Sequence, residues 1–415
     1  MRHILDGVQV VDFSQVLAGP TLTRFMVELG AEVIKIELPP AGDSSRALPH
    51  HHPDTGRSAY YVQQNRGKRS ICLDPRVPEA ADAVRQLVAE ADVVVESFSP
   101  GTIDRLGFGW DTVHELNPSA VMVSISAFGQ EGPLARKPGY DNIAQAYSGI
   151  MSMIGEPDQP PPIVAAAIGD VMTGVHGFGA VMAALFHRER TGEGQHVEVS
   201  LLDSYVGCHE INVQAHSISG GDIEPTRPGS HHFAVCPFGV FPVGDPANGG
   251  GSVVICLVSP DQWGRLCGLM GRADMVDDPR YVDNTVRCEH QAEVNEAITS
   301  WLATIPSADA AIETLESQRI PCAPVLSVAE MVAHPHMRQR GTIRTVSDRA
   351  IGEFDVPGFP LRFSAFPEPL DLEAPFLGEH NAEVLLERCG VDQATFDRLV
   401  ADGSIDSEPV VRVPD

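Results

Sequence analysis

Short β-branched runs alternate with helical patterns along the first half of this chain, and this alternation limits the possible folds more than any other feature. Apolar residues recur at helical spacing over 20–29 and 79–90. The strand-like runs are 8–13 (VQVVDF), 31–36 (AEVIKI), 71–73 (ICL), 92–96 (DVVVE) and 120–125 (AVMVSI). Strands linked through helices by short connections form parallel sheets with helices on both faces. We therefore predict an α/β fold with a doubly wound, Rossmann-like parallel sheet, whose ligands bind in the loops that follow the strands.

The rest of the sequence predicts a second, smaller α/β domain and a return to the first. A long helical pattern rich in Gly and Ala runs from Ile168 to Glu189, where small residues allow close packing of backbones. Residues 1–215 are predicted to form the N-terminal part of the large domain and 225–330 the small domain. Residues 331–415 are predicted to be a Pro-rich linker followed by a C-terminal return to the large domain, with a mobile tail after Asp402.

Composition excludes several classes of function. The chain has 29 Lys and Arg against 56 Asp and Glu, a net charge of −27, so a nucleic-acid partner is not expected. No apolar run has the length of a membrane span, and Asp6 and Asp12 interrupt any signal-peptide pattern, which predicts a cytoplasmic protein without a membrane partner. The eight cysteines form no CxxC pair, and no metal site is predicted. A strand–GxGxxG–helix fingerprint is absent, which argues against a nicotinamide dehydrogenase.

Two loops next to predicted strands could bind an anionic ligand. The first, 14–20 (SQVLAGP), contains Val16, Leu17 and Ala18 and leads into a helix, whose free backbone N–H groups suit an anion or a carbonyl. The second, 65–70 (NRGKRS), places three cations in four positions of an acidic chain, and Arg and Lys both bind phosphate oxygens. An ordinary strand–helix turn and a solvated run of charges are the alternatives.

Three further segments carry chemistry-bearing side chains. In 93–109, Phe98 could stack on a flat ring while Arg105 holds a phosphate. In 137–142 (KPGYDN), Tyr140 and Asp141 begin a helix, where a cap is the ordinary role of Asp141. Asp170 also begins a helix, and it is either a cap or, among apolar and small neighbours, a nucleophile toward a carbonyl group.

Together these segments make the sequence resemble the class III coenzyme A transferases, the group that includes formyl-CoA transferase and carnitine-CoA transferase. The matching segments occur in the family's order and span almost the whole chain. They are VVDFSQVLAGP, LGAEVIKIE with GDSSR, NRGKRSICLD, ADVVVESFSPGTIDRLGFG, KPGYDN with SGIM, GDVMTG, RTGEGQHVEVSLLDS, and GEHN at 378–381.

The resemblance implies an interlocked homodimer, in which both chain ends build the large domain, the middle builds the small one and long linkers thread each protomer through its partner. It also implies an enzyme that takes a coenzyme A thioester and a small carboxylic acid as substrates, with no permanently bound cofactor.

Matched position by position, the resemblance makes Asp170 the nucleophilic aspartate. Val16, Leu17 and Ala18 match a backbone contact with coenzyme A, and Tyr140 matches a tyrosine near the thioester. Leu38 stands where relatives often have Arg, so that phosphate contact is expected either to be missing or to be supplied by Arg46 or Arg69. The remaining residues predicted to bind coenzyme A are Asn65, Lys68, Arg69, Ser97, Phe98, Arg105, Lys137 and Asp141.

The implied mechanism passes through a mixed anhydride and an aspartyl-CoA thioester. The main alternative is an α-methylacyl-CoA racemase, a relative that carries His-Asp where this chain has Tyr140-Asp141; tyrosine is a poor base at neutral pH. A CoA-binding protein without turnover is a further alternative. Residues 227–242 (RPGSHHFAVCPFGVFP) lack the glycine-rich loop of formyl-CoA transferase, so a role in oxalate or formate metabolism is not expected. A dicarboxylic or larger acid is expected as the acceptor, with succinyl-CoA as a candidate donor. His231 and His232 are candidate acceptor contacts.

Overall fold

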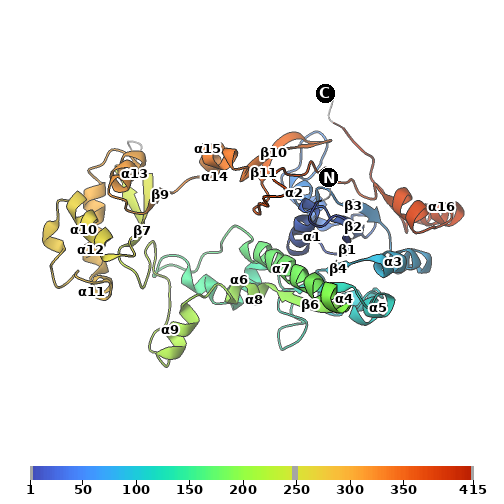
Figure 1. Cartoon of the computed structure of the whole chain (residues 1–415), viewed down its shortest axis with the longest axis horizontal. Helices are drawn as coiled ribbons and strands as arrows, with labels where there is room; N and C mark the ends of the chain where they lie inside the picture. The colour runs from blue at the N-terminus through green and yellow to red at the C-terminus, as the bar shows by residue number, and fades with distance from the viewer. Residues whose placement is uncertain (1–2, 245–250, 413–415) are drawn as a thin grey trace. The chain divides into compact units, whose positions relative to one another are not determined.

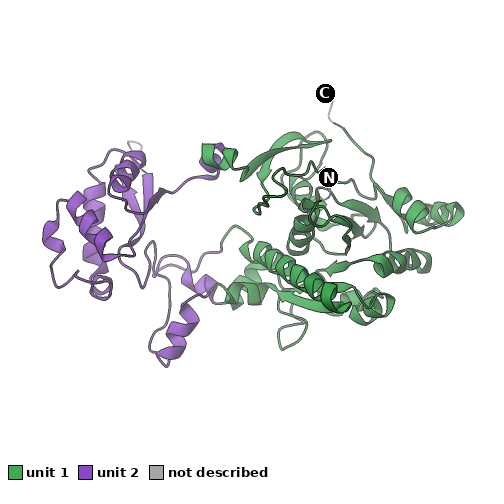
Figure 2. Ribbon diagram, viewed as in Figure 1, with its two compact units in different colours: residues 1–148, 164–208, 335–415 green, residues 149–163, 209–334 purple. Residues whose placement is uncertain are grey.

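The structure is a computed structural model that describes residues 3–244 and 251–412 (Figure 1). The chain divides into two compact units. Unit 1 comprises residues 1–148, 164–208 and 335–415, and unit 2 comprises residues 149–163 and 209–334 (Figure 2).

Unit 1 is built on a six-stranded parallel sheet with the strand order β3-β2-β1-β4-β5-β6, which confirms the predicted doubly wound fold. Its core strands are Val- and Ile-rich and buried on both faces, as expected when helices cover each side. The order reverses between β1 and β4, which creates the switch point where such sheets bind ligands. The strands are β1 (Gln9–Asp12), β2 (Glu32–Glu37), β3 (Arg69–Cys72), β4 (Val93–Glu96), β5 (Val121–Ser126) and β6 (Gln195–Ser200).

Helices cover this sheet, and a hairpin of β10 (Ile343–Asp348) and β11 (Gly352–Pro357) belongs to the same unit. The helices of unit 1 are α1 (Ala18–Glu28), η1 (Ser44–Ala47), α2 (Ala59–Asn65), α3 (Pro78–Glu90), α4 (Thr102–Arg105), α5 (Trp110–Leu116), α6 (Asp141–Tyr147), α7 (Ile168–Thr191), α8 (Leu201–Val206), α15 (Pro335–Gln339), the π-helical turn η5 (Glu383–Arg388) and α16 (Gln393–Ala401).

Helix α7 packs closely on α1 because its small residues leave room. A Cβ atom at Gly174 would lie 2.6 Å from the carbonyl oxygen of Ala18, and one at Gly177 would lie 2.7 Å from Leu22 Cδ1. Among the described residues, α7 is also the one helix long and apolar enough to cross a membrane by length and composition. Packing against α1 and the sheet accounts for the buried part of that apolar surface.

Unit 2 is a three-stranded antiparallel sheet, ordered β7-β8-β9, with helices packed around a core of its own. Trp263, Leu266 and Ile298 are buried in that core. The elements are η2 (Ile150–Met153), α9 (Asn212–Ile218), β7 (Phe238–Val243), β8 (Gly251–Cys256), α10 (Pro260–Leu269), η4 (Ala273–Met275), α11 (Asn284–Glu289), α12 (Gln291–Leu302), α13 (Ala308–Ser317), β9 (Cys322–Pro324) and α14 (Val328–Ala333).

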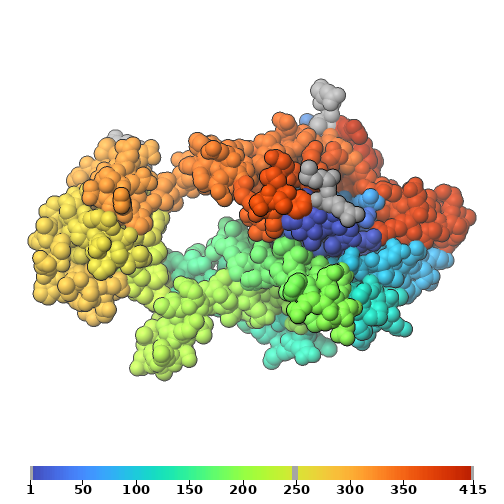
Figure 3. All heavy atoms as spheres, viewed as in Figure 1, coloured from blue at the N-terminus to red at the C-terminus, as the bar shows by residue number. Residues whose placement is uncertain are grey.

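The structure differs from the sequence predictions in the domain bounds and in the C-terminal segment. Residues 209–215, expected in the large domain, and 331–334, expected in the linker, belong to unit 2. Residues 149–163, expected in the large domain, belong to unit 2, because the Gly229 N–H donates to the Gly155 carbonyl and Arg227 donates to the Glu156 carbonyl. The segment after Asp402, expected to be mobile, is held in unit 1. Ile405 is buried in the core that also holds α3, and it pairs with Leu73. Figure 3 shows the red part of the chain beside the blue part.

Candidate active site

A pocket of about 340 Å³ opens at the carboxyl ends of β1, β4 and β5, beside the switch point of the sheet. Of the residues predicted from the sequence, the fold brings eight together around it. These are Val16, Leu17, Ala18, Ser97, Phe98, Lys137, Tyr140 and Asp170. The loops after three different strands therefore converge on one site, as expected for a parallel sheet.

Buried ions hold the first of these loops, residues 14–17, in place. The carboxylate of Asp12 accepts hydrogen bonds from the Ser14 backbone N–H at 2.9 Å and from Lys68 Nζ at 3.0 Å. Lys35 Nζ donates to the Ser14 carbonyl at 2.6 Å and lies 2.9 Å from Asp43. Burial alone would raise the pKa of Asp12, but Lys68 and Lys35 hold it at about 2, so this carboxylate is charged throughout the neutral range.

Val16 has a left-handed backbone with φ of 66°, which a β-branched residue rarely adopts. The Asp43 carboxylate accepts a hydrogen bond from the Val16 N–H at 3.1 Å, and Ser97 Oγ accepts one from the Gln15 N–H at 3.0 Å. These bonds hold the strained conformation. Val16 directly precedes Leu17, the N-cap of α1, which makes no side-chain capping bond. Leu17 and Ala18 line the pocket, so the free N–H groups at the start of α1 are candidates to bind a carbonyl oxygen there.

Asp170 lies in the first turn of α7, and Asp141 positions it. One Asp141 oxygen accepts a hydrogen bond from the Asp170 backbone N–H at 2.9 Å, and the other accepts one from the Tyr205 hydroxyl at 2.7 Å. The Tyr205 ring occupies the space beside Gly169, where a Cβ atom would lie 2.2 Å from Tyr205 Cε2. Asp141 therefore caps a helix other than its own, and glycine at 169 allows the ring to pack there.

The environment of Asp170 favours its neutral form. Burial raises the pKa of Asp170 to about 7, and the negative charge of Asp141 adds to the effect. Burial also raises the pKa of Tyr60 on α2, with Asp170 as the second cause, so Tyr60 lies within electrostatic range of the carboxyl. A carboxyl group with a pKa near neutral is present in both protonation states at physiological pH, and its carboxylate is a better nucleophile than that of an ordinary aspartate.

The other predicted residues in the pocket line its walls. The Phe98 N–H donates to Glu96 at 2.8 Å, which fixes the turn after β4. Lys137 Nζ donates to the Tyr147 hydroxyl at 3.0 Å at the rim. The Tyr140 side chain is 79% exposed, so it stands at the mouth of the pocket. These groups offer a ring, a cation and a hydroxyl to a bound molecule.

The three cations of the NRGKRS segment do not reach the pocket, although the sequence predicted that Asn65, Lys68 and Arg69 bind the ligand. Asn65 and Lys68 are buried and bonded to each other at 2.9 Å, and Lys68 is ion-paired with Asp12. Arg69 begins β3, at the amino edge of the sheet, where it pairs with Glu383 at 2.6 Å. Lys68 and Arg69 therefore pair with carboxylates that are distant in the sequence, and not with the phosphate groups of a ligand.

Other predicted residues also lie outside the pocket. Asp141 is buried beneath it. Arg105 is exposed on α4, donates to Thr102 and lies near Gly101, and Gly101 and Arg136 line an adjoining hollow. Arg46, expected to compensate for Leu38, forms an ion pair with Glu37 at 2.8 Å instead.

His231 and His232 line a hollow of about 350 Å³ within unit 2. The His231 Nδ1 atom is buried without a hydrogen-bond partner in the part of the chain that the structure describes.

Sequence reasoning missed several residues of the site. Gln15, Ser44 and Ser126 line the pocket, and Tyr205 supports Asp141. Ser126 directly follows the predicted strand 120–125, which is a usable signal, whereas Tyr205 lies in an ordinary helical pattern and gave none. Among residues 3–244 and 251–412, no cluster of three or more His, Cys, Asp or Glu could hold a metal ion.

Comparison with known proteins places this site in a family. The model of CoA-transferase family III matches residues 5–381. The chain is 36% identical over 390 residues to the succinate–glutarate CoA-transferase of Agrobacterium fabrum, covering 92% of this chain and 95% of that one. It is 35% identical over 409 residues to the formyl-CoA:oxalate CoA-transferase of Escherichia coli O157:H7, covering 93% and 96%.

A solved structure has the same fold. The crystal structure of a CAIB/BAIF family protein from Brucella suis has a TM-score of 0.79 and 33% identity, covering 93% of this chain and 100% of that one. Because the family model spans most of the chain and these relatives match almost end to end, the chain belongs to CoA-transferase family III, and it is a class III CoA-transferase.

Proposed function

We propose that this CoA-transferase moves coenzyme A from an acyl-CoA donor to a small carboxylic acid through an aspartyl-CoA thioester on Asp170. The observation that carries the proposal is the position of Asp170: a partly buried carboxyl with a pKa raised to about 7, in a pocket lined by the N-terminus of α1. The pocket lies where sheets of this topology bind their ligands.

The reaction consists of four carbonyl exchanges. The Asp170 carboxylate attacks the thioester carbonyl of the donor, which gives a mixed anhydride and expels CoA thiolate. The thiolate attacks the aspartyl carbonyl, which forms the aspartyl-CoA thioester and releases the donor carboxylate. The acceptor carboxylate attacks this thioester and gives a second anhydride and CoA thiolate. The thiolate then attacks the acceptor acyl carbonyl, so Asp170 returns as a carboxylate without net proton transfer.

The protein contributes position and charge stabilisation to these steps. The N–H groups at the start of α1 are the candidate donors to the oxyanion that each attack forms. Asp141 and Tyr205 keep the Asp170 backbone in place. The pantetheine arm of coenzyme A would extend past Phe98 and Ser97, with Lys137 and Arg105 near its phosphates.

Succinyl-CoA is the donor that we propose to test first. Relatives at 33–38% identity have names that include succinate, glutarate, D-citramalate and mesaconate, and others at a similar identity act on formyl-CoA and oxalate. The absence of a glycine-rich loop in 227–242 favours a larger acceptor, such as a dicarboxylic acid with a longer chain, over oxalate. His231 and His232 are the proposed acceptor contacts.

A screen of acceptor acids with succinyl-CoA and acetyl-CoA, read by mass spectrometry of the acyl-CoA products, tests this function. We expect a new acyl-CoA only when donor and acceptor are both present. A parallel incubation with a chiral 2-methylacyl-CoA in deuterated water tests the racemase alternative. Deuterium at the α-carbon without an acceptor acid would overturn the proposal, and coenzyme A binding without any product would favour a non-catalytic protein.

The pH dependence of the reaction should follow Asp170. Only the carboxylate attacks the thioester, and its raised pKa means that the group is protonated below about pH 7. We expect kcat/KM to rise with pH through about 7 and to be roughly 1% of its plateau at pH 5, because each unit below the pKa lowers the ionised fraction about tenfold. Initial rates between pH 5 and 9 measure this. A profile that is flat from pH 5 to 8 would contradict it.

We propose in addition that the exposed face of α7 packs against a second copy of the chain. Ile168, Val171, Val175 and Phe186 on this helix are 40–65% exposed and apolar, although α1 and the sheet cover its other face. Such a continuous apolar helix face is unfavourable in water. The homodimer that the resemblance implies would cover it.

Sedimentation velocity tests the dimer. We expect the wild type to be a dimer and Val175→Asp/Phe186→Asp to assemble poorly, because the charges would be buried at the interface. Glu189→Gln, an exposed change on the same helix, serves as the control. A monomeric wild type that floats with lipid vesicles would instead indicate that α7 contacts a membrane.

A further inference from the structure

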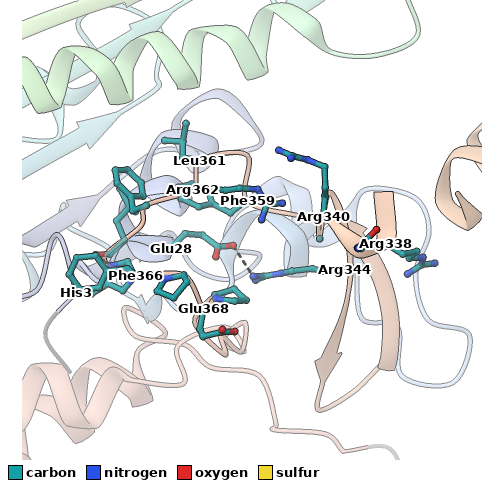
Figure 4. A pocket seen from close by; sticks show the side chains of 16 residues that line it. His3, Glu28, Arg338, Arg340, Arg344, Phe359, Leu361, Arg362, Phe366 and Glu368 are labelled. Atoms are coloured by element: carbon teal, nitrogen blue, oxygen red, sulfur yellow. Dashed lines mark hydrogen bonds and ion pairs between the residues drawn. The ribbon is translucent and has the colours of Figure 1, made fainter. Parts of the chain in front are cut away.

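A second pocket in unit 1 shares no residue with the candidate active site and carries an excess of positive charge. It has a volume of about 270 Å³ and lies beside the C-terminal end of α1, the residues after α15 and the start of β10 (Figure 4). Its walls include four arginines and two glutamates. These are Arg338, Arg340, Arg344, Arg362, Glu28 and Glu368.

One carboxylate at this pocket, that of Glu28, interacts with several guanidinium groups. Glu28 Oε1 accepts a hydrogen bond from Arg66 at 2.6 Å and from Arg344 at 3.2 Å. Arg24, one helical turn before Glu28 on α1, also interacts electrostatically with this carboxylate. We call Arg24, Arg66 and Arg344 the arginine cluster. Its three positive charges face a single negative charge.

The arginine cluster is buried and incompletely hydrogen-bonded. Arg24 is 7% exposed and Arg66 1% exposed. Within the described residues, Nε and Nη1 of Arg24, Nε and Nη1 of Arg66, and Nε of Arg344 are buried without a hydrogen-bond partner. Buried donors on charged groups are rarely left unpaired, because the lost hydration is not recovered. The usual explanation is a bound anion or water.

The lowered pKa values of the buried arginines also favour a bound anion. Burial lowers the pKa of Arg24 and of Arg66 to about 10, in spite of the opposing charge of Glu28. Arg344 lowers both pKa values further. The three cations therefore repel one another at close range, and a bound anion would relieve that repulsion.

Two further arginines stand at the entrance. Arg340 and Arg362 are exposed and their side chains have no ion pair or hydrogen bond among residues 3–244 and 251–412, whereas Arg338 is occupied by Asp355. Arg344 reaches toward Glu28 in the pocket, and the rings of His3 and Phe366 stack at its other end, 4.7 Å apart (Figure 4). Such local positive charge is unexpected in a chain of net charge −27 and attracts anions selectively.

We propose that this pocket is a separate anion site, in which Arg344 and Arg362, backed by Arg24 and Arg66, bind the phosphate group of a small molecule. A doubly charged phosphate would balance the two positive charges that Glu28 leaves uncompensated. Guanidinium groups donate two parallel hydrogen bonds to phosphate oxygens, which suits a cluster with several free N–H groups. The hollow is concave and lined by aromatic rings, as small-molecule sites are.

Thermal unfolding of the full-length protein in phosphate or chloride at equal ionic strength tests this site. We expect inorganic phosphate to raise the wild-type midpoint in a saturable way, because a ligand that binds the folded state stabilises it. Arg344→Met and Arg362→Met should each weaken the apparent affinity for phosphate about tenfold or more, since each removes charged hydrogen bonds. In chloride, Arg344→Met should unfold close to the wild-type midpoint, because the lost ion pair with Glu28 is offset by the relieved repulsion between Arg344 and the cations of Arg24 and Arg66.

Two control variants test whether the stabilisation by phosphate arises at this pocket. Lys137→Met, at the candidate active site, and Arg398→Met, an exposed arginine on α16, should both keep the phosphate response of the wild type. No stabilisation beyond chloride, or an unchanged response in Arg344→Met and Arg362→Met, would overturn the proposal. An equal, Arg344-dependent response to succinate would reassign the site to carboxylates. Altered sedimentation of Arg344→Met without any phosphate response would indicate that the cluster contacts a second copy of the chain.

Discussion

Asp170→Asn is expected to lower kcat by at least about 10³-fold while leaving the protein folded. The substitution keeps the size of the side chain but removes the carboxylate that we propose as the nucleophile toward the thioester, and loss of a covalent nucleophile has effects of this order. The measurement is the rate of acyl-CoA exchange with succinyl-CoA and the best acceptor. Asp111→Asn is the matched control, because Asp111 also lies in the first turn of a helix but is exposed on α5; it should retain full activity.

Trapping of the proposed covalent intermediate provides a second readout of the same variant. Hydroxylamine added with acyl-CoA alone should convert Asp170 to a hydroxamate that peptide mass spectrometry locates. The label should be absent in Asp170→Asn. Label at another carboxylate would move the nucleophile elsewhere, and substantial transfer by Asp170→Asn would exclude the aspartyl mechanism altogether.

At alkaline pH, Asp170→Asn should have a higher free energy of unfolding than the wild type. The pKa of Asp170 is about 7 in the folded protein and near 3.8 as the ordinary value, so folding disfavours the charged form. Its contribution to stability is therefore present below about pH 4 and is lost as pH rises through 7. Asparagine has no such loss, and we expect a gain of about 1–3 kcal/mol at pH 8, less than the full shift implies because solvent still reaches the site. Urea unfolding at pH 5 and pH 8 measures it.

Asp141→Asn is expected to produce the second large effect, a fall in kcat of about 10- to 100-fold with a shift of the pH profile toward acid. The two oxygens of Asp141 each accept one hydrogen bond, from the Asp170 N–H and the Tyr205 hydroxyl, and asparagine replaces one of these oxygens with an NH2 group that cannot accept. The start of α7 would therefore move, and small displacements of reacting groups are costly. Loss of the negative charge should also lower the pKa of Asp170 toward its ordinary value.

Tyr205→Phe separates the two roles of Asp141. It removes one hydrogen-bond donor but leaves the Asp141 charge and its bond to the Asp170 N–H. We expect a smaller fall in kcat and no acid shift of the profile. An acid limb that stays near pH 7 in Asp141→Asn would show that the charge of Asp141 does not act on the nucleophile. Unchanged kcat would show that it does not position Asp170.

Much of the fold was predictable because it depends on local periodicity. Strands buried on both faces read as runs such as VVVE at Val93–Glu96, and the intervening helices follow their apolar spacing. The parallel sheet and the location of the site at the strand ends follow from that alternation. Residues 149–163 escaped prediction because their partners, Arg227 and Gly229, lie far along the chain.

The site was predictable only where the residue itself lies next to a strand end or a helix start. Val16, Ser97 and Asp170 satisfy that condition, and the fold brings them to one pocket. Lys68 and Arg69 were assigned to a ligand because a cluster of cations has the same sequence pattern whether it binds phosphate, faces water or pairs with carboxylates. Their actual partners are Asp12 and Glu383, and nothing in the sequence indicates either pairing.

The sequence by itself determined the class of sheet and the order of its motifs, because each depends on residues that are neighbours along the chain, and its resemblance to the family singled out Asp170 as the candidate nucleophile. Only the tertiary structure decided which charges pair and which are left over. It joins Asp141 to α7 and Arg66 to Glu28 across 29 and 38 positions of sequence. The physical reason is that a buried charge is stabilised by whichever group the fold brings within a few ångströms, and that distance is a property of packing.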